Sequence, residues 1–161
     1  MPAGSPEAVR SLNPEVEFAT SSTSASEASG LISLSVVLSA AAAQDVTIPY
    51  SVGGSATAAD ATVATGPLVI PAGQLSGSID VTVVDDSESE GTERVALTLG
   101  APTGGVLGSV TTHEVVIADN EAAATLSFDL SSSSASEGAG SVALAMTLSS
   151  ARTEAVTVEY S

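Results

Sequence analysis

Apolar and polar residues alternate along most of the chain, which is the pattern of half-buried antiparallel β-strands. In the stretch GLISLSVVL at 30–38, Ile32, Leu34, Val36 and Leu38 fall on one face. Glycine and proline separate the alternating stretches, as they do at turns. We therefore predict seven strands, at residues 16–25, 30–38, 45–52, 67–71, 77–84, 93–100 and 109–118.

Seven short strands within about 105 residues indicate an all-β fold, an immunoglobulin-like antiparallel β-sandwich. Pro49 interrupts one strand pattern, which suggests an edge strand or a bulge there. One helical pattern competes, because SASE at 24–27 matches the capping box in which Ser is followed three residues later by Glu. The residues that follow it alternate with period two, so we expect a strand there instead of a helix.

The chain contains an internal repeat. Residues 16–51 align with 126–161 at a constant offset of 110 and without a gap. We predict a linker at 1–13, a complete domain at 14–121 and a truncated second copy at 122–161, so that the chain is part of a tandem array. The matched pairs include Phe18 with Phe128, Glu27 with Glu137, Gly30 with Gly140, Leu34 with Leu144, Leu38 with Leu148, Val46 with Val156 and Tyr50 with Tyr160.

The second copy holds the equivalents of only the first three strands. Two or three strands alone are marginally stable in water. We expect residues 124–161 to be loosely ordered, or to pair their open edges with another molecule. They should bind no ion independently, because Glu137 lacks the other carboxylates of a complete domain.

The charge balance is strongly acidic, with 19 acidic residues against Arg10, Arg94 and Arg152, and a formal net charge of −16. Nucleic acids and anionic membranes are therefore poor partners, and cations or basic surfaces are better ones. The absence of cysteine excludes a disulfide framework and a thiolate metal site.

No apolar run reaches the roughly 18–20 residues that span a bilayer, so we expect no direct membrane insertion by this segment. The N-terminal residues MPAGSPEAVRSLNPE have no apolar core and do not resemble a signal peptide. If the protein is exported, its targeting signal lies outside this chain or is of another kind.

Carboxylates are concentrated at one end of the predicted sandwich. Successive connections fall at alternate ends when every strand crosses the domain, so the first, third and fifth connections share an end with the residues after the last strand. The opposite end holds only Asp45 in its connections. The carboxylates expected at the first end are Glu27, Asp60, Asp85, Asp86, Glu88, Glu90, Glu93, Asp119 and Glu121.

The run VVDDSESEGTE at 83–93 contributes most of this charge. Two carboxylates 4 Å apart repel by roughly 4 kcal/mol at an effective dielectric constant of 20, so several such pairs would rival the stability of a domain. A bound cation would remove the repulsion, and calcium fits best because it accepts 6–8 oxygen ligands in loose geometry. The alternative is that these loops are simply solvated.

The motifs of the first copy resemble the Calx-beta domain, which occurs in sodium/calcium exchangers, in an integrin cytoplasmic region and in tandem arrays of bacterial surface proteins. They are E..G at 27–30, GSATAAD at 54–60, G.L.IPAG at 66–73, V.VVDDSESEGTE at 81–93 and VIADNE at 116–121. The resemblance covers residues 14–121 fully, and residues 124–161 as the opening of a second copy.

The resemblance implies calcium as the bound ion. The ligands that it implies are Glu27, Asp60, Asp85, Asp86, Glu90, Asp119, Asn120 and Glu121. Two features depart from the family pattern: GSATAADA lacks the usual aromatic residue after Asp60, and Asn120 replaces a carboxylate. We therefore expect weaker affinity than in calcium sensors, and a structural site instead of a regulatory one.

Other chemistry is not supported by the sequence. His113 is the only histidine and shares a strand face with Val115 and Ile117, so a transition-metal site is not expected. No G-x-S-x-G motif accompanies His113, and we do not expect an enzyme.

Two functional hypotheses remain. The first is a calcium-binding structural or adhesion module of a tandem-repeat extracellular or cell-surface protein, in which calcium rigidifies one end of the domain and the junction between repeats. Its partners would be calcium ions, neighbouring repeats and other surface proteins, with roles in cell adhesion and cell communication. The alternative is a metal-free acidic β-sandwich that acts as a spacer between other domains.

Overall fold

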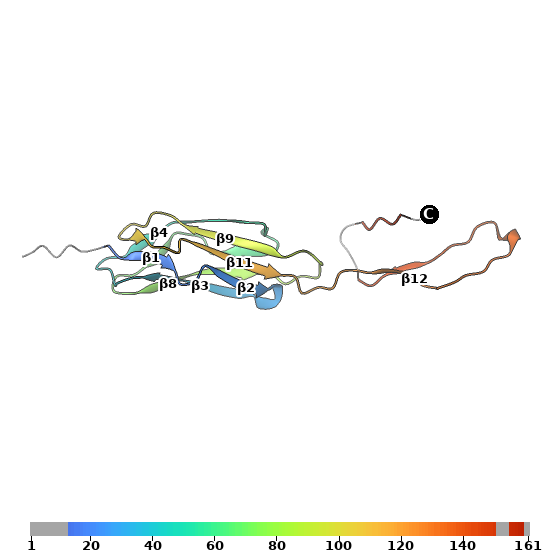
Figure 1. The fold of residues 1–161 in the computed structure, drawn as a ribbon, viewed down its shortest axis with the longest axis horizontal. Helices are drawn as coiled ribbons and strands as arrows, with labels where there is room; N and C mark the ends of the chain where they lie inside the picture. The colour runs from blue at the N-terminus through green and yellow to red at the C-terminus, as the bar shows by residue number, and fades with distance from the viewer. Residues whose placement is uncertain (1–12, 151–154, 160–161) are drawn as a thin grey trace, which may run out of the picture.

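The computed structural model describes residues 13–150 and 155–159; the predicted linker up to residue 12 and residues 151–154 and 160–161 of the predicted second copy lie outside them. The first copy folds into short strands joined by turns and loops (Figure 1). These are β1 (Glu15–Phe18), β2 (Ser22–Ser26), β3 (Leu31–Leu38), β4 (Val46–Ile48), β5 (Tyr50–Gly54), β6 (Ala61–Val63), β7 (Leu68–Ile70), β8 (Ser76–Val83), β9 (Glu93–Leu99), β10 (Val106–Leu107) and β11 (Thr112–Ala118).

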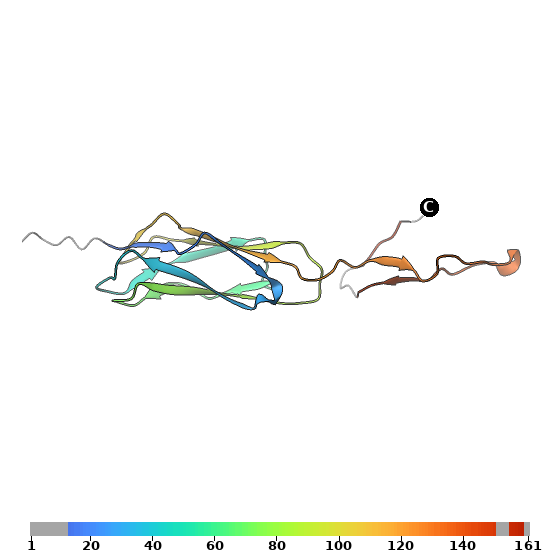
Figure 2. The ribbon, with the colours of Figure 1, turned by 60° about the horizontal axis from the view of Figure 1, so that its bottom comes forward.

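Two sheets pack face to face as the two layers of a sandwich (Figures 1 and 2). One sheet has the order β10-β1-β3-β8-β6 and the other the order β2-β11-β9-β5, while β4 and β7 form a small sheet of their own. Neighbouring strands are antiparallel except for β1 with β10 and β2 with β11, which are parallel. The predicted all-β, immunoglobulin-like sandwich is confirmed.

The core consists of the inward-facing aliphatic residues of both sheets, because every second side chain of a strand points to the same face. Phe18 is its single aromatic residue. The core residues are Val16, Phe18, Leu34, Val36, Leu38, Val46, Ile48, Ile70, Ile79, Val81, Val83, Val95, Leu97, Leu99, Val115 and Ile117. All of them belong to the first copy.

The strand predicted at 16–25 is in fact two strands that belong to different sheets. The chain leaves β1 after Phe18 and joins β11 as β2 from Ser22 onward. His113 holds the crossover between them: its Nδ1–H donates to the Thr20 carbonyl oxygen at 2.6 Å, and its Nε2 accepts from the Thr23 hydroxyl at 3.0 Å. Alternation alone continues through such a crossover, which is why the pattern predicted one strand.

The strand predicted at 45–52 also divides, at Pro49. Proline has no N–H for a sheet hydrogen bond, so pairing is interrupted there. Before it, β4 pairs with β7; after it, β5 pairs with β9 and forms an edge of its sheet. The short strands β6 and β10 were not predicted, because two or three residues are too few to show a period.

The connection between β2 and β3 contains a 3-10 turn, η1 (Glu27–Ser29). Its capping residue is Ser26, whose side chain accepts from Ala28 N–H, while the Ser29 hydroxyl accepts from Ser26 N–H. The SASE motif therefore leads into a single turn that begins at its Glu27, and its Ser24 is not the cap. Gly30 ends the turn with a φ of 64°, a conformation that favours glycine, and β3 follows as predicted.

The second copy begins with β12 (Leu126–Phe128) and β13 (Met146–Leu148), which pair with each other, and contains the turn η2 (Glu137–Ala139) between them. Residues 122–125 lead from the end of the sandwich to β12 (Figure 2). Among the described residues, no helix is long and apolar enough to cross a membrane.

Candidate metal centre

One end of the sandwich collects the carboxylates, and we call it the acidic pole. It is formed by the β2–β3, β5–β6 and β8–β9 connections and by the residues after β11. Register explains the placement, because Gly54 at the end of β5 lies opposite Val95 of β9, and Ala61 at the start of β6 lies opposite Val83 of β8. Asp45 lies at the other end, where it accepts from Ala72 N–H.

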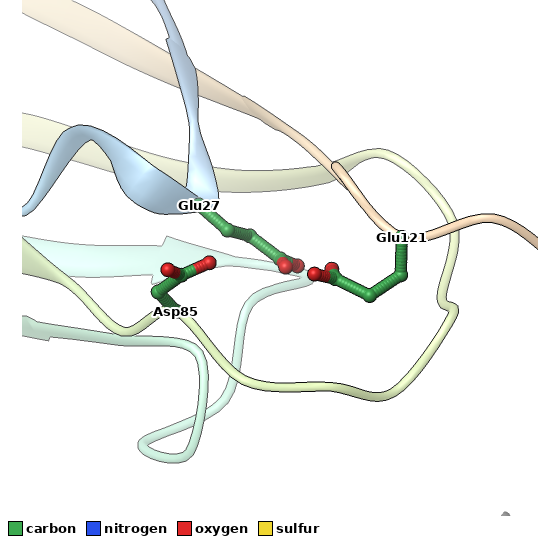
Figure 3. Close-up of side chains that lie close together, drawn as sticks. All are labelled: Glu27, Asp85 and Glu121. Atoms are coloured by element: carbon green, nitrogen blue, oxygen red, sulfur yellow. The ribbon is translucent and has the colours of Figure 1, made fainter. Parts of the chain in front are cut away.

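Three carboxylates from distant segments form a first triad (Figure 3). Glu27 extends from η1, Asp85 follows β8, and Glu121 follows β11. One oxygen of each lies within 4.8 Å of the others. Glu27 is only 4% exposed, so its carboxylate is held inside the pole instead of in solvent.

A second triad lies at the same pole and consists of Asp60, Glu90 and Glu93. One oxygen of each again lies within 4.8 Å of the others. Asp60 is buried, Glu93 is half-buried and Glu90 is exposed. Each triad thus combines one buried carboxylate with two that are more accessible.

Asp119 stands between the two triads and organises the backbone around them. Its Oδ2 accepts from Glu90 N–H at 2.7 Å, and its Oδ1 accepts from Glu121 N–H at 2.7 Å. The Ser89 hydroxyl also donates to Oδ2 at 3.4 Å. These donors lower the pKa of Asp119, the largest effect being that of Glu121 N–H.

The two remaining predicted residues, Asp86 and Asn120, lie beside the triads. Asn120 Nδ2 donates to Asp85 Oδ1 at 3.2 Å, which helps to orient that carboxylate. Asp86 Oδ1 accepts from Glu88 N–H at 2.7 Å, and the Asp86 charge acts on both Glu27 and Glu90. All eight residues of the predicted ligand set are therefore at the acidic pole; their role as ligands stays a prediction.

The pKa of Glu27 is raised to about 7, chiefly because burial removes the carboxylate from water. A hydrogen bond with the Glu121 carboxyl and the negative charges of Asp119, Glu121 and Asp86 add to the effect. Burial also raises the pKa of Glu121. Glu27 and Glu121 therefore hold a proton more readily than ordinary glutamates when no cation is bound.

Two of the three carboxyl groups in the second triad, those of Glu93 and Glu90, also have raised pKa values. Burial raises the pKa of Glu93 to about 6, with further contributions from its hydrogen bond to Asp60 and from the charges of Asp60 and Glu90. Glu90 has a raised pKa as well, first through burial and then through the charge of Asp60. The pKa of Asp60 is lowered instead, mainly because Thr57 N–H donates to its Oδ2 at 2.6 Å.

The sequence places Glu93 at this pole, but the predicted ligand set omits it. Glu93 is the first residue of β9, where strand alternation gave no reason to assign it to the site. Its membership of the second triad depends on where the β5–β6 loop brings Asp60. That loop is anchored to β9, because Ser55 N–H and Ala56 N–H both donate to the Arg94 carbonyl oxygen.

The donor set fits a hard cation. One carboxylate oxygen each of Glu27, Glu93 and Glu121 is buried and has no hydrogen-bond partner. Buried oxygens without donors are costly unless a cation binds them. Arg94, the one arginine among residues 13–150 and 155–159, pairs with Glu114, so no arginine or lysine of this described part offers either triad a counter-charge.

Fold and site together define a β-sandwich module with a carboxylate-lined pole. The sequence model of the Calx-beta domain family matches residues 12–121, and the chain belongs to this family. Calx-beta is a family of binding and structural domains. No curated protein matches the chain by sequence.

Solved structures with this fold include individual Calx domains. The apo-form Calx CBD1 domain has a TM-score of 0.60 and 22% identity, over 66% of this chain and 97% of that chain. The Calx CBD2 domain has a TM-score of 0.60 and 20% identity, over 65% of this chain and 86% of that chain. The calcium binding domain CBD12 of CALX1.1 has a TM-score of 0.60 and 22% identity over 65% of this chain, which spans 44% of that chain.

Proposed function

We propose that the acidic pole binds calcium and that bound calcium stabilises the sandwich. The observation that carries the proposal is the buried oxygen of Glu27, which has no donor and lies in a triad with the Asp85 and Glu121 carboxylates. The ligands would be the eight predicted residues together with Glu93. The calcium binding domain CBD12 of CALX1.1, which shares the fold, supports the choice of ion.

The donor chemistry favours calcium over other metals. The pole offers carboxylate oxygens and the Asn120 amide, but no histidine and no cysteine. Transition metals prefer nitrogen or sulfur ligands. Magnesium demands near-ideal octahedral geometry and keeps several waters, whereas calcium accepts many carboxylates from flexible loops.

We further propose that the domain is a structural module of a tandem-repeat protein, at the cell surface or outside the cell. Support comes from the position of the pole: Asp119, Asn120 and Glu121 directly precede the short connection to β12, so an ion held there would also stiffen the junction. Neighbouring repeats and other surface proteins would be its partners, in adhesion or cell communication. No catalytic role is part of this proposal.

The proposal can be tested by thermal unfolding of the full chain in calcium and in chelator. At a hundredfold excess over the dissociation constant, calcium should add about 2.7 kcal/mol, which is roughly 10 °C for a domain of this size. Replacing Asp85→Asn and Asp86→Asn together should abolish the calcium shift. The metal-free melting temperature should stay the same or rise, because repulsion is relieved.

A matched control removes the same charge at the other end of the sandwich, through Glu15→Gln and Asp45→Asn. This variant should keep the full calcium shift. A metal-free spacer would instead show no calcium-specific shift in any variant beyond that of an equal ionic strength of sodium chloride. A wild-type shift in the Asp85/Asp86 variant would show that these two residues are not ligands.

A further inference from the structure

The β5–β6 loop, residues 55–60, crosses from one sheet of the sandwich to the other at the acidic pole and ends in Asp60. β5 pairs with β9 in one sheet, and β6 pairs with β8 in the other. The end of the loop is fixed near β8, where the Asp60 carbonyl oxygen accepts from Val84 N–H at 2.8 Å. Glu93, which shares the second triad with Asp60, is the first residue of β9. The separation of these two carboxylates therefore depends on how the start of the loop is attached to β9.

Ser55 attaches the loop to β9 through two hydrogen bonds with Arg94, the residue that directly follows Glu93. Ser55 N–H donates to the Arg94 carbonyl oxygen at 2.9 Å. Arg94 N–H donates in return to the Ser55 hydroxyl oxygen at 3.0 Å. Ala56 N–H adds a third bond, to the Arg94 carbonyl oxygen at 3.0 Å. The Ser55 hydroxyl therefore fixes the backbone immediately beside Glu93.

Gly54 allows the loop to come this close to β9. Its φ is 119°, in the region that favours glycine. A Cβ atom at this position would lie 2.0 Å from the Arg94 carbonyl oxygen. Any larger residue would push the loop away from β9, so the hydrogen bonds between Ser55 and Arg94 depend on this glycine.

Hydrogen bonds within the loop connect Ser55 to the Asp60 carboxylate. Thr57, two residues after Ser55, donates its N–H to Asp60 Oδ2 at 2.6 Å. The Thr57 carbonyl oxygen accepts from Asp60 N–H at 3.2 Å, and the Thr57 hydroxyl accepts from Ala59 N–H at 3.2 Å. The loop thus holds the carboxylate as one hydrogen-bonded unit, and a shift at Ser55 should move Asp60 relative to Glu93.

The second triad is sensitive to such a shift because its three carboxylates must reach the same ion. One oxygen each of Asp60, Glu90 and Glu93 lies within 4.8 Å of the others. A Glu93 oxygen is buried and has no hydrogen-bond partner, so it gains most from a correctly placed cation. Residues that orient metal ligands without touching the metal typically change its affinity by roughly 10–100-fold when they are removed.

We propose that Ser55 is a positioning residue of the acidic pole, which holds Asp60 in reach of the cation that Glu90 and Glu93 also bind. Ser55 acts through Asp60 and is not itself a ligand, because its hydroxyl oxygen is engaged by Arg94 N–H. The inference rests on the proposed calcium binding. It adds to that proposal a residue outside the ligand set that controls the affinity.

Isothermal titration of the full chain with calcium chloride tests the role of Ser55. The variant Ser55→Ala removes the hydrogen bond from Arg94 N–H and opens no cavity, because the side chain is exposed. Its dissociation constant for calcium should be at least about tenfold higher than that of wild type. The variant Ser55→Thr keeps a hydroxyl group at this position and should restore the affinity to near the wild-type value.

Ser39→Ala is the matched control. The Ser39 hydroxyl is also exposed and accepts from a backbone N–H, that of Glu15, at 2.9 Å, but at the opposite end of the sandwich. Each alanine variant loses one hydrogen bond of the same kind, so both should melt slightly below wild type in chelator. Only Ser55→Ala should bind calcium more weakly.

The outcomes separate the positioning role from the proposed function. A wild-type affinity in Ser55→Ala, or a loss that Ser55→Thr does not restore, would overturn the positioning role and leave calcium binding intact. An equal loss of affinity in Ser39→Ala would also overturn it, because the weaker binding would then follow from reduced stability. A wild-type chain that binds no calcium would overturn the proposed function, and the positioning role with it.

Discussion

Glu27 shows at the scale of one residue how the acidic pole couples stability to protons and cations. Its carboxyl group is buried, faces other acids and has an oxygen without a donor. A buried carboxylate is tolerated either as the neutral acid or with a bound cation. Glu27 is therefore expected to hold a proton at low pH and to bind a cation at higher pH, when its carboxyl group is ionised.

Without metal, the stability of the sandwich should fall as pH rises. The folded-state pKa of Glu27 is about 7 and that of Glu93 is about 6, both above the ordinary value of 4.5. Between pH 4.5 and 7 the folded state therefore binds more protons than the unfolded state, and deprotonation with rising pH costs stability. Thermal unfolding in chelator at pH 5 and pH 7.5 should show the lower melting temperature at pH 7.5.

The variant Glu27→Gln should flatten this dependence and raise the metal-free melting temperature at pH 7.5 by a few degrees, or about 1 kcal/mol. Glu15→Gln, at the exposed start of β1 at the opposite end of the sandwich, serves as the control and should leave the pH dependence unchanged. An equally steep fall in the Glu27 variant would mean that another group carries it.

In the presence of calcium, the dependence of stability on pH should reverse, so that stability increases as pH rises. Calcium competes with the protons held by the two triads, so its apparent affinity should increase between pH 5 and pH 7.5. Isothermal titration of calcium at the two pH values measures this directly. An affinity that is independent of pH would contradict ligation by carboxylates with raised pKa values.

At the scale of elements, the crossover from β1 to β2 places η1 and Glu27 at the pole. β1 pairs with β3 in one sheet, and β2 pairs with β11 in the other. His113 links β11 to the crossover through Thr20 and Thr23, and its ring centroid lies 5.3 Å from that of Phe18. This buried histidine has a structural role that its isolation in the sequence did not reveal.

Replacing His113→Ala should destabilise the sandwich by about 2–4 kcal/mol, because a cavity forms and the Thr20 carbonyl oxygen loses its donor. Urea unfolding measures the loss. Thr23→Val removes only the Nε2 hydrogen bond and should cost about 1 kcal/mol. A loss below 1 kcal/mol for His113→Ala would show that the crossover does not depend on the histidine.

At the scale of the whole molecule, the sandwich is independent of the second copy. Every core residue lies in the range from Val16 to Ile117, and the β12–β13 hairpin contributes none. A chain ending at Ala123 should therefore melt within about 2 °C of the full chain, and with the same calcium shift. A drop of 10 °C or more, about 2.7 kcal/mol, would show that residues 124–161 support the sandwich.

The sequence by itself determined the class of fold and the position of the acidic pole. Period-two alternation fixes which side chains point inward, and the order of strands fixes at which end each connection lies. Glu27, Asp60, Asp85, Asp119 and Glu121 could therefore be assigned to one pole from sequence alone. At the offset of 110 residues, Leu126 and Leu148 correspond to Val16 and Leu38, and the structure pairs both sets in the same way.

Only the tertiary structure decided how that pole divides into two triads. Alternation does not show where a strand changes sheets, so the crossover at Ala19–Ser21 was missed. Pro49 was expected to mark an edge strand or a bulge, but not the change of sheet between β4 and β5. The grouping of Glu93 with Asp60 and Glu90 depends on a loop anchored by the Arg94 carbonyl oxygen, a contact between residues far apart in the chain. Burial of Glu27, and hence its raised pKa, arises only when several segments meet around it, because desolvation belongs to the folded assembly and to no single segment.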